Sequence, residues 1–140
     1  MKAEFTNNLV TGNKIIDEQH RELISKINDL LTAIETSQGQ ATAIRTLNFL
    51  NDYVIYHFEA EENLQKEAGY PGLKEHQKQH AILRQTVADL TDMLTEEECA
   101  SPAFMKQLND KVIDWLYRHI EGFDRSVAEY LFLSDNPDRY

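Results

Sequence analysis

The chain has 140 residues, of which 41% are apolar and 27% charged, so it is long enough to form one soluble globular domain with a substantial core. Its 24 acidic residues outnumber its 14 basic residues, and the net charge of −10 argues against nucleic acid or an anionic membrane as a partner. The single cysteine, Cys99, allows no internal disulfide and follows acidic residues that disfavour a reactive thiolate.

The sequence shows no targeting or membrane signal. Residues 1–10 contain no apolar core of signal-peptide length, and no window approaches the roughly 20 apolar residues of a membrane span. No repeat or linker marks a second domain. We therefore expect residues 1–140 to form a single domain of a soluble, cytoplasmic protein.

The first half of the chain predicts an irregular arm followed by two amphipathic helices. Residues 1–16 lack helical periodicity, and Asp17 is the expected N-cap of a first helix that ends near residue 37. The second helix starts near Ala41 and ends at residues 69–72, a turn rich in glycine and proline.

The second half predicts two more helices of the same kind. The third starts near Leu73, and Ser101 and Pro102 open the fourth as its N-cap and first helical residue. Residues 125–140 are expected to form a short tail. Four such helices with short connections predict an all-α, antiparallel up-down four-helix bundle.

All five histidines of the chain fall on the apolar faces of these helices. They are His20, His57, His76, His80 and His119. One histidine on such a face is usually a core residue held by a hydrogen bond, but five bring many ring nitrogen atoms into one small core. Each unpaired polar group there costs about 1–3 kcal/mol. Metal coordination uses many nitrogen lone pairs at once, so the pattern indicates a metal site.

Two carboxylates are candidates to complete this site. Glu61 lies four residues after His57, and residues four apart share a helix face. Asp124 lies five residues after His119, which places it off the His119 face of a regular α-helix. Gly122 permits a π-like turn that would bring Asp124 back to that face.

Five imidazoles and two carboxylates are too many ligands for one ion. Structural zinc takes four ligands and usually includes cysteine. Seven ligands suit two ions bridged by both carboxylates, and imidazole with carboxylate suits iron among the redox metals. With a bridging hydroxide, an ion with three histidines has six ligands and an ion with two has five, which leaves one open position.

The order His20, His57-x-x-x-Glu61, His76-x-x-x-His80 and His119-x-x-x-x-Asp124 resembles the hemerythrin family, specifically the single-domain bacteriohemerythrins. The match covers the chain from about residue 5 to 125. The resemblance implies two iron ions with a bridging oxo or hydroxo group, bridged by Glu61 and Asp124. It assigns His76, His80 and His119 to one iron, and His20 and His57 to the iron with the open position.

The same resemblance implies an apolar oxygen pocket. Leu116 corresponds to a residue that lines this pocket in the family, and Phe58, Trp115 and Ile120 are expected to help keep it dry. The chain departs from the family at two positions. Phe5 stands where the family often has tryptophan, and Gln65 stands where it often has methionine.

The resemblance implies reversible binding of dioxygen for storage, delivery or sensing. We assign no catalytic residue and do not expect an enzyme, because no Cys, Lys or Tyr lies beside the ligands on the inward faces. Two alternatives stay open: a di-iron oxidase, peroxidase or nitric-oxide handling enzyme, or a signalling module that acts through residues 1–16 or 125–140. Zinc in place of iron is a lesser alternative. We expect a monomer or weak oligomer, with an oxygen recipient or a signalling protein as a further partner.

Overall fold

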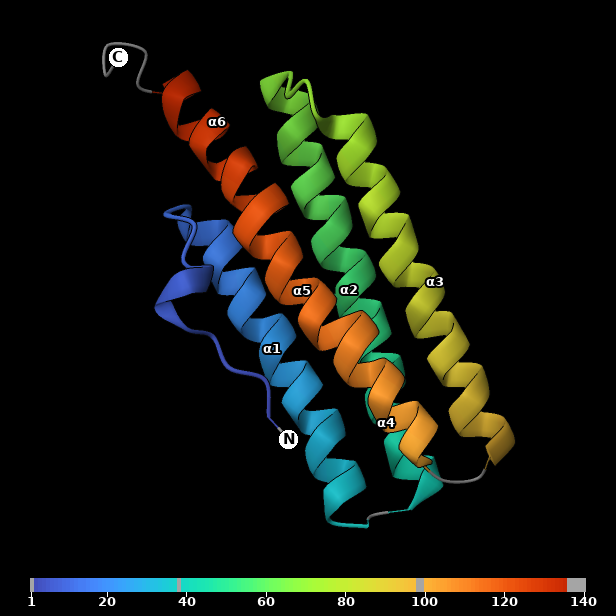
Figure 1. Cartoon of the computed structure of the whole chain (residues 1–140). Helices are drawn as coiled ribbons and strands as arrows, with labels where there is room; N and C mark the ends of the chain where they lie inside the picture. The colour runs from blue at the N-terminus through green and yellow to red at the C-terminus, as the bar shows by residue number, and fades with distance from the viewer. Residues whose placement is uncertain (1, 38, 98–99, 136–140) are drawn as a thin grey trace.

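The computed structural model is an antiparallel bundle of four long helices, as predicted (Figure 1). It describes residues 2–37, 39–97 and 100–135. The first three helices are α1 (Lys14–Glu35), α2 (Gln40–Ala68) and α3 (Leu73–Glu97). The fourth helix is made of α4 (Pro102–Leu108), α5 (Asp114–His119) and α6 (Arg125–Asp135), joined by π-helical segments at Asn109–Ile113 and Ile120–Asp124. Along the chain, α1 packs against α2, α2 against α3, and α3 against α4.

Capping side chains account for the first residues of α4 and α1, and the cap of α1 differs from the predicted one. Ser101 caps α4 by accepting a hydrogen bond from the Phe104 amide, as expected. The N-cap of α1 is Asn13, whose side chain accepts from the Ile16 amide, so the prediction that Asp17 fills this position was wrong. The carboxylate of Asp17 points back to the arm instead, where it accepts from the Thr11 amide and hydroxyl.

The interior of the bundle is divided into an apolar half and a histidine half. The apolar half lies toward the end where α1 meets α2 and α3 meets α4 (Figure 1). Its fully buried side chains come from all four helices and include Leu30, Leu47, Leu50, Val87, Leu90, Phe104 and Leu108. The buried histidines lie nearer the α2–α3 turn. The apolar half therefore supplies the hydrophobic packing that holds the helices in register beneath the polar cluster.

The fourth helix is longer than the sequence indicates. Residues 125–135 were expected to begin a short tail outside the four helices, but they continue the fourth helix as α6. Val127 and Ala128 are buried on its inner face, and the Tyr130 hydroxyl donates to the Ala68 carbonyl at 3.2 Å. These contacts give α6 a packed face. Such tertiary packing stabilises a helix more than the intrinsic helix propensity of its residues does. The rest of the expected tail, residues 136–140, and Cys99 lie outside the described residues.

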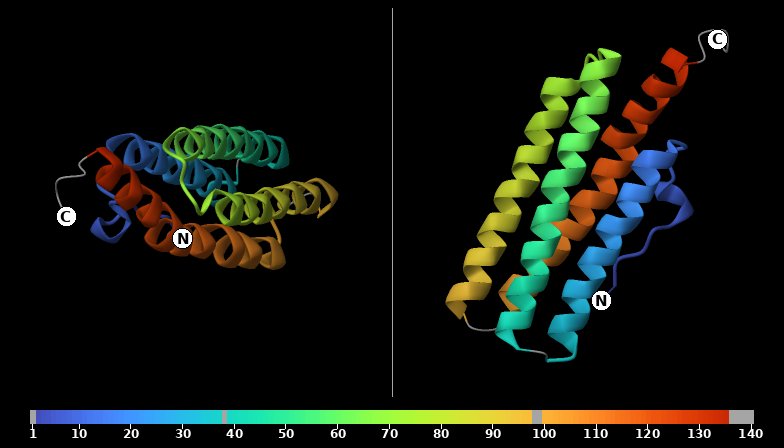
Figure 2. Two further views of the ribbon diagram at one scale, coloured as in Figure 1. Left: turned by 90° about the horizontal axis from the view of Figure 1, so that it is seen from above. Right: turned by 180° about the vertical axis from the view of Figure 1, so that it is seen from behind.

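The N-terminal arm is irregular as expected, but it ends at Asn13 because residues 14–16 already belong to α1. It lies along the outside of α1 and the fourth helix (Figure 2). Its only regular element among residues 2–12 is a short 3₁₀ turn at Asn7–Leu9. Ala3 exchanges two hydrogen bonds of 2.8 Å with the Asn28 side chain, and the Glu4 amide donates to the Tyr117 hydroxyl. The arm is therefore fastened to both the first and the fourth helix.

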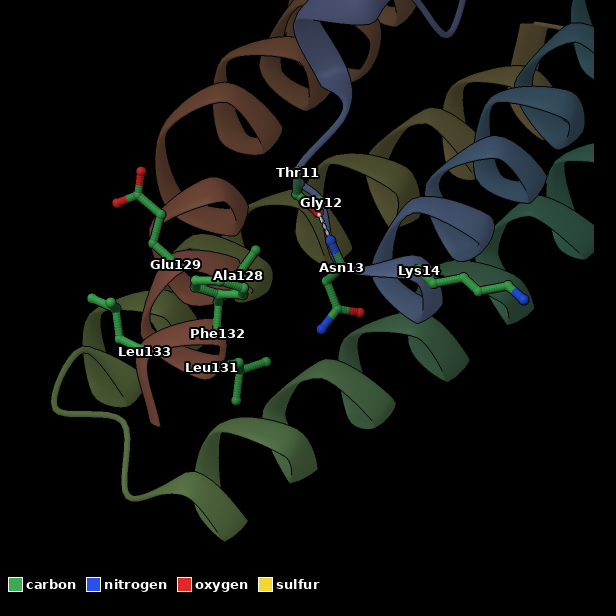
Figure 3. A pocket seen from close by; sticks show the side chains of 9 residues that line it. All are labelled: Thr11, Gly12, Asn13, Lys14, Ala128, Glu129, Leu131, Phe132 and Leu133. Carbon is green, nitrogen blue, oxygen red and sulfur yellow. Dashed lines mark hydrogen bonds between the residues drawn. The ribbon is translucent and has the colours of Figure 1, made fainter. Parts of the chain in front are cut away.

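A pocket of about 560 Å³ lies between the start of α1 and the outer turns of α6 (Figure 3). Thr11, Gly12, Asn13 and Lys14 line it from the α1 side, and Ala128, Glu129, Leu131, Phe132 and Leu133 line it from α6. None of the seven predicted ligands lines this pocket. In the part of the chain that the structure describes, no helix has the length and apolar character needed to cross a membrane.

Candidate metal centre

The structure brings all seven predicted ligands together in the interior of the bundle. His20 comes from α1, His57 and Glu61 from α2, His76 and His80 from α3, His119 from the end of α5, and Asp124 from the π-helical segment that follows. Each of the seven side chains is at most 4% exposed. Burial of this many polar groups in one place is costly unless something charged holds them.

The seven residues form two overlapping groups that could each hold a metal ion. Within each group, one ligand atom from every residue lies within 4.8 Å of the others. One group has three histidines and the other has two, and Glu61 and Asp124 belong to both. This division agrees with the assignment implied by the resemblance, in which the two carboxylates are shared.

The Glu61 carboxylate directs its two oxygen atoms to different groups. Its Oε1 lies 2.7 Å from His76 Nε2 and 3.4 Å from His80 Nε2. Its Oε2 lies 3.5 Å from His57 Nε2 and 4.0 Å from His20 Nε2. A carboxylate in this orientation can bind one ion with each oxygen atom.

The Asp124 carboxylate is arranged in the same way from the opposite side of the bundle. Its Oδ1 lies 3.0 Å from His76 Nε2 and 3.2 Å from His119 Nε2, and its Oδ2 lies 2.8 Å from His20 Nε2. Together the two carboxylates enclose the space between the groups of three and two histidines.

A π-helical turn at Ile120–Asp124 places Asp124 on the His119 face, which confirms the turn expected from the five-residue spacing. A π turn closes its hydrogen bond between residues five apart, whereas an α turn closes it between residues four apart. Asp124, five residues after His119, therefore returns to the His119 face. Gly122 is not required for this geometry, because a Cβ atom added there would meet nothing within 4 Å and its φ is not positive. A second π-helical segment at Asn109–Ile113 was not anticipated from the sequence.

Three of the five histidines have a hydrogen-bond partner at Nδ1, on the side away from the cluster. His57 pairs with Gln19 Oε1 at 2.7 Å, and His80 pairs with Glu62 Oε2 at 2.8 Å. An acceptor at Nδ1 keeps the proton there and leaves the Nε2 lone pair free for a metal. Neither Gln19 nor Glu62 was assigned a role from the sequence.

Gln65 is the third such partner, and its side-chain Nε2 lies 3.0 Å from His76 Nδ1. Its Oε1 and Nε2 exchange places by a half-turn of the amide, and the orientation with Oε1 toward His76 lets Nδ1–H donate to it. Gln65 is fully buried and lies four residues after Glu61 on the same helix face. That spacing was the sequence signal that could have assigned it to the site.

Aromatic rings cover the outer histidines of the group of three. The Phe58 ring stacks on His80 at 3.7 Å, and the His119 ring lies between Trp115 at 4.5 Å and Phe123 at 5.2 Å. Phe58 is buried, as are Leu116 and Ile120, so three of the four expected pocket residues lie in the dry interior. Trp115 is only partly buried and stacks on His119, a histidine of the group of three.

Burial and the charges within the cluster shift the pKa values of its members in opposite directions. Burial lowers the pKa of His57 to about 4, despite the opposing effect of Glu61. Burial also acts to lower the pKa of His76, but Asp124 and Glu61 raise it to about 9. Burial acts to raise the pKa of Asp124, but His119 and the other surrounding histidines hold it well below its ordinary value. The interior of the cluster therefore favours ionised carboxylates with positive charge next to them.

Several atoms of the cluster have no hydrogen-bond partner among the described residues. They include both carboxylate oxygen atoms of Glu61 and Asp124, both ring nitrogen atoms of His20, and Nε2 of His80. Buried polar atoms are rarely left in this state, and each costs free energy. These unpaired lone pairs and the adjacent carboxylates fit a pair of cations. A four-helix bundle with this interior belongs to the class of proteins that bind metal with histidine and carboxylate side chains.

Comparison with known proteins identifies the family. The model of the hemerythrin HHE cation binding domain matches residues 11–131. The bacteriohemerythrin of Stenotrophomonas maltophilia is 32% identical over 125 residues, which is 89% of this chain and 78% of that protein. A hemerythrin-like protein of Naegleria gruberi is 30% identical over 120 residues, or 86% of each chain. The chain belongs to the hemerythrin family.

Solved structures agree with this assignment. A crystal structure of a hemerythrin point mutant superposes with a TM-score of 0.78 and is 25% identical in sequence. The superposition covers 91% of this chain and 95% of the hemerythrin chain. The similarity therefore extends over the four helices and does not depend on the cluster alone.

Proposed function

We propose that this protein binds dioxygen reversibly at a pair of iron ions held by the seven clustered residues. The observation that carries the proposal is the division of the two carboxylates, each of which presents one oxygen atom to each group of histidines. Glu61 and Asp124 would bridge the two ions. His76, His80 and His119 would complete one coordination sphere, and His20 and His57 the other.

Iron is the metal that this donor set favours for such a role. Neutral imidazole and carboxylate suit iron among the redox metals, and the set contains no thiolate. A reduced iron pair supplies the electrons and the open coordination position that dioxygen binding requires. The unequal groups of three and two histidines support an open position on the His20 and His57 side.

The side chains around the cluster would hold the ligands and exclude water. Gln19, Glu62 and Gln65 fix the orientation of three imidazoles through Nδ1. Phe58 and Ile120, each at most 1% exposed, lie in the interior beside the histidines and would limit access of solvent protons. Exclusion of water favours release of the bound oxygen unchanged over its reduction.

The surroundings of the cluster favour a binding protein over an enzyme. The residues nearest the ligands are apolar rings, amides and the Glu62 carboxylate, which is already paired with His80 and Gln77. Among the described residues, the one buried carboxylate outside the cluster is Asp17, which binds the arm. No described side chain is placed as a nucleophile or as a general base beside the ligands. The alternative of an oxidase, peroxidase or nitric-oxide handling enzyme predicts turnover with a reductant. The signalling alternative predicts a ligand-dependent change at residues 1–16 or 125–140.

The test is to measure iron per chain, reduce the protein without air, and record its visible spectrum as oxygen is admitted and removed. The proposal expects two irons per chain and a spectrum that appears with oxygen and disappears without it. The Glu61→Gln variant should lose iron, whereas Glu59→Gln, an exposed acid on the same helix, should keep it. Irreversible oxidation at first contact with oxygen would favour the enzyme or redox-sensor alternative, and folded protein without iron would refute the proposal.

A further inference from the structure

A pocket of about 250 Å³ lies between α3 and the fourth helix, next to His119 of the histidine cluster. It is lined by Gln79 of α3, by Asp110 of the first π-helical segment, and by Trp115, Arg118, His119 and Phe123. His119 is the one residue that belongs both to this lining and to the seven-residue cluster. A molecule bound in the pocket would therefore touch the outer edge of a candidate metal ligand.

The orientation of His119 directs its Nε2 atom to the cluster, so its Nδ1 atom is the ring nitrogen available to a molecule in the pocket. Its Nε2 faces the cluster, 2.9 Å from His76 Nε2 and 3.2 Å from Asp124 Oδ1. The Trp115 and Phe123 rings cover the two faces of its imidazole, with interplanar angles of 10° and 12°. Nδ1 is buried and has no hydrogen-bond partner among the described residues, unlike Nδ1 of the other two histidines in its group.

The other polar groups of the pocket are mostly unpaired donors. The Arg118 guanidinium and the Gln79 amide form no hydrogen bond or ion pair within the described parts of the chain. Asp110 is the single carboxylate in the lining, and its oxygen atoms already accept from Lys106 at 2.9 Å and from Asn109 at 3.2 Å. The pocket thus offers free donors and an acid that is already paired.

We propose that this pocket binds a small organic carboxylate. The carboxylate would accept hydrogen bonds from the Arg118 guanidinium, the Gln79 amide and His119 Nδ1–H, and its apolar part would pack against Trp115 and Phe123. The guanidinium favours a carboxylate over a neutral amide, because its donors match two carboxylate oxygen atoms and its charge is complementary. The volume admits a molecule of a few carbon atoms rather than a peptide segment.

Such a ligand would act on the metal centre through the His119 ring. An acceptor at Nδ1 increases the electron donation of Nε2, as other acceptors do for histidine ligands of metals. This favours the more highly charged state of the metal, so the reduction potential of the centre would become more negative. This second part of the inference rests on the proposed iron site, whereas the binding itself does not.

The binding test uses sodium isobutyrate as the probe and the fluorescence of Trp115, the only tryptophan in the chain. Isobutyrate is titrated at constant ionic strength into the protein as isolated and into protein loaded with zinc, which does not quench the indole. Isobutyramide, which has the same shape without the charge, is the matched control ligand. We expect a saturable change with isobutyrate, with a dissociation constant on the order of millimolar, and none with the amide over the same range.

Two exposed arginines provide the control variants. Arg118→Gln should weaken isobutyrate binding about tenfold or more, because it removes the charged donor. Arg84→Gln removes an exposed arginine of α3 that does not line the pocket and should leave binding unchanged. The absence of a saturable change, equal responses to acid and amide, or unchanged binding by Arg118→Gln would each overturn the assignment of the pocket.

The coupling is tested by measuring the midpoint potential of the iron-loaded protein with and without saturating isobutyrate. A negative shift that is lost in Arg118→Gln supports the coupling, and binding without a shift refutes it. Protein that holds no iron but shows the Trp115 response would refute the proposed function and leave the carboxylate site standing. The two failures are therefore distinguishable.

Discussion

Replacement of Gly122 by alanine should stabilise the protein without disturbing the candidate metal centre. Gly122 lies within the π-helical turn that carries Asp124, which suggests that the turn needs glycine. The structure argues otherwise, because an added Cβ atom would meet nothing within 4 Å and the backbone is not in the left-handed region. Alanine would lower the conformational entropy of the unfolded chain and introduce no clash in the folded chain.

The expected gain in the free energy of unfolding is about 0.5–1 kcal/mol, the ordinary advantage of alanine over glycine in a helix. For 140 residues the unfolding entropy is about 0.3 kcal/mol/K, so Tm should rise by about 2–3 °C. Thermal unfolding of the metal-free protein, followed by circular dichroism, measures this shift without a contribution from bound metal. Metal content and visible spectrum after reloading should equal those of the unaltered protein.

Gly69→Ala is the matched control for this prediction. Gly69 ends α2 with a φ of 66°, in the left-handed region, so alanine there should destabilise the fold by about 1–2 kcal/mol. A lower Tm for Gly122→Ala, or a loss of metal in that variant, would refute the reasoning. Either result would mean that the π turn depends on the glycine backbone.

Three further predictions concern the surroundings of the centre and the arm. Glu62→Gln weakens the acceptor at His80 Nδ1, so metal affinity should fall about tenfold in competition with a chelator. Arg125→Gln removes the guanidinium that donates to the arm carbonyl of Asn8, so amide hydrogens of residues 2–12 should exchange faster by mass spectrometry while those of α3 are unchanged. Burial, together with Glu22 and Tyr56, raises the pKa of Tyr53 to about 12 from 10.0. Because the unfolded chain ionises this phenol first, stability should fall as pH rises through that interval, and Tyr53→Phe should show a smaller fall in alkaline denaturation.

Much of the site could be predicted because helix geometry is a short-range property. Residues four apart share a face, so the pairs His57–Glu61 and His76–His80 fix two sides of the cluster before any tertiary contact is known. The five-residue spacing of His119 and Asp124 indicated a π turn, and the structure contains one. The all-α bundle followed from the periodicity of the apolar residues.

The features that were not predicted from the sequence depend on contacts that helical periodicity does not describe. Asp17 has the chemistry of an N-cap, but the arm competes for its carboxylate and Asn13 takes that position. The helical state of residues 125–135 depends on packing against α2, including the Tyr130 contact with Ala68. The stacking of Trp115 on His119 could have been predicted, because the two residues lie four apart on α5 and share a face.

The attachments of the arm constrain the order in which the molecule can form. The arm binds Tyr117 and Arg125, which follow their partners Glu4 and Asn8 by 113 and 117 residues. During synthesis Tyr117 and Arg125 are made long after the arm. The arm therefore has nothing on the fourth helix to bind until nearly the whole bundle exists. Contacts of such sequence separation also carry the largest loop-closure entropy when they form early. The contacts of the arm with the fourth helix should therefore form last, once the four helices have assembled, whereas its contacts with α1 can form earlier.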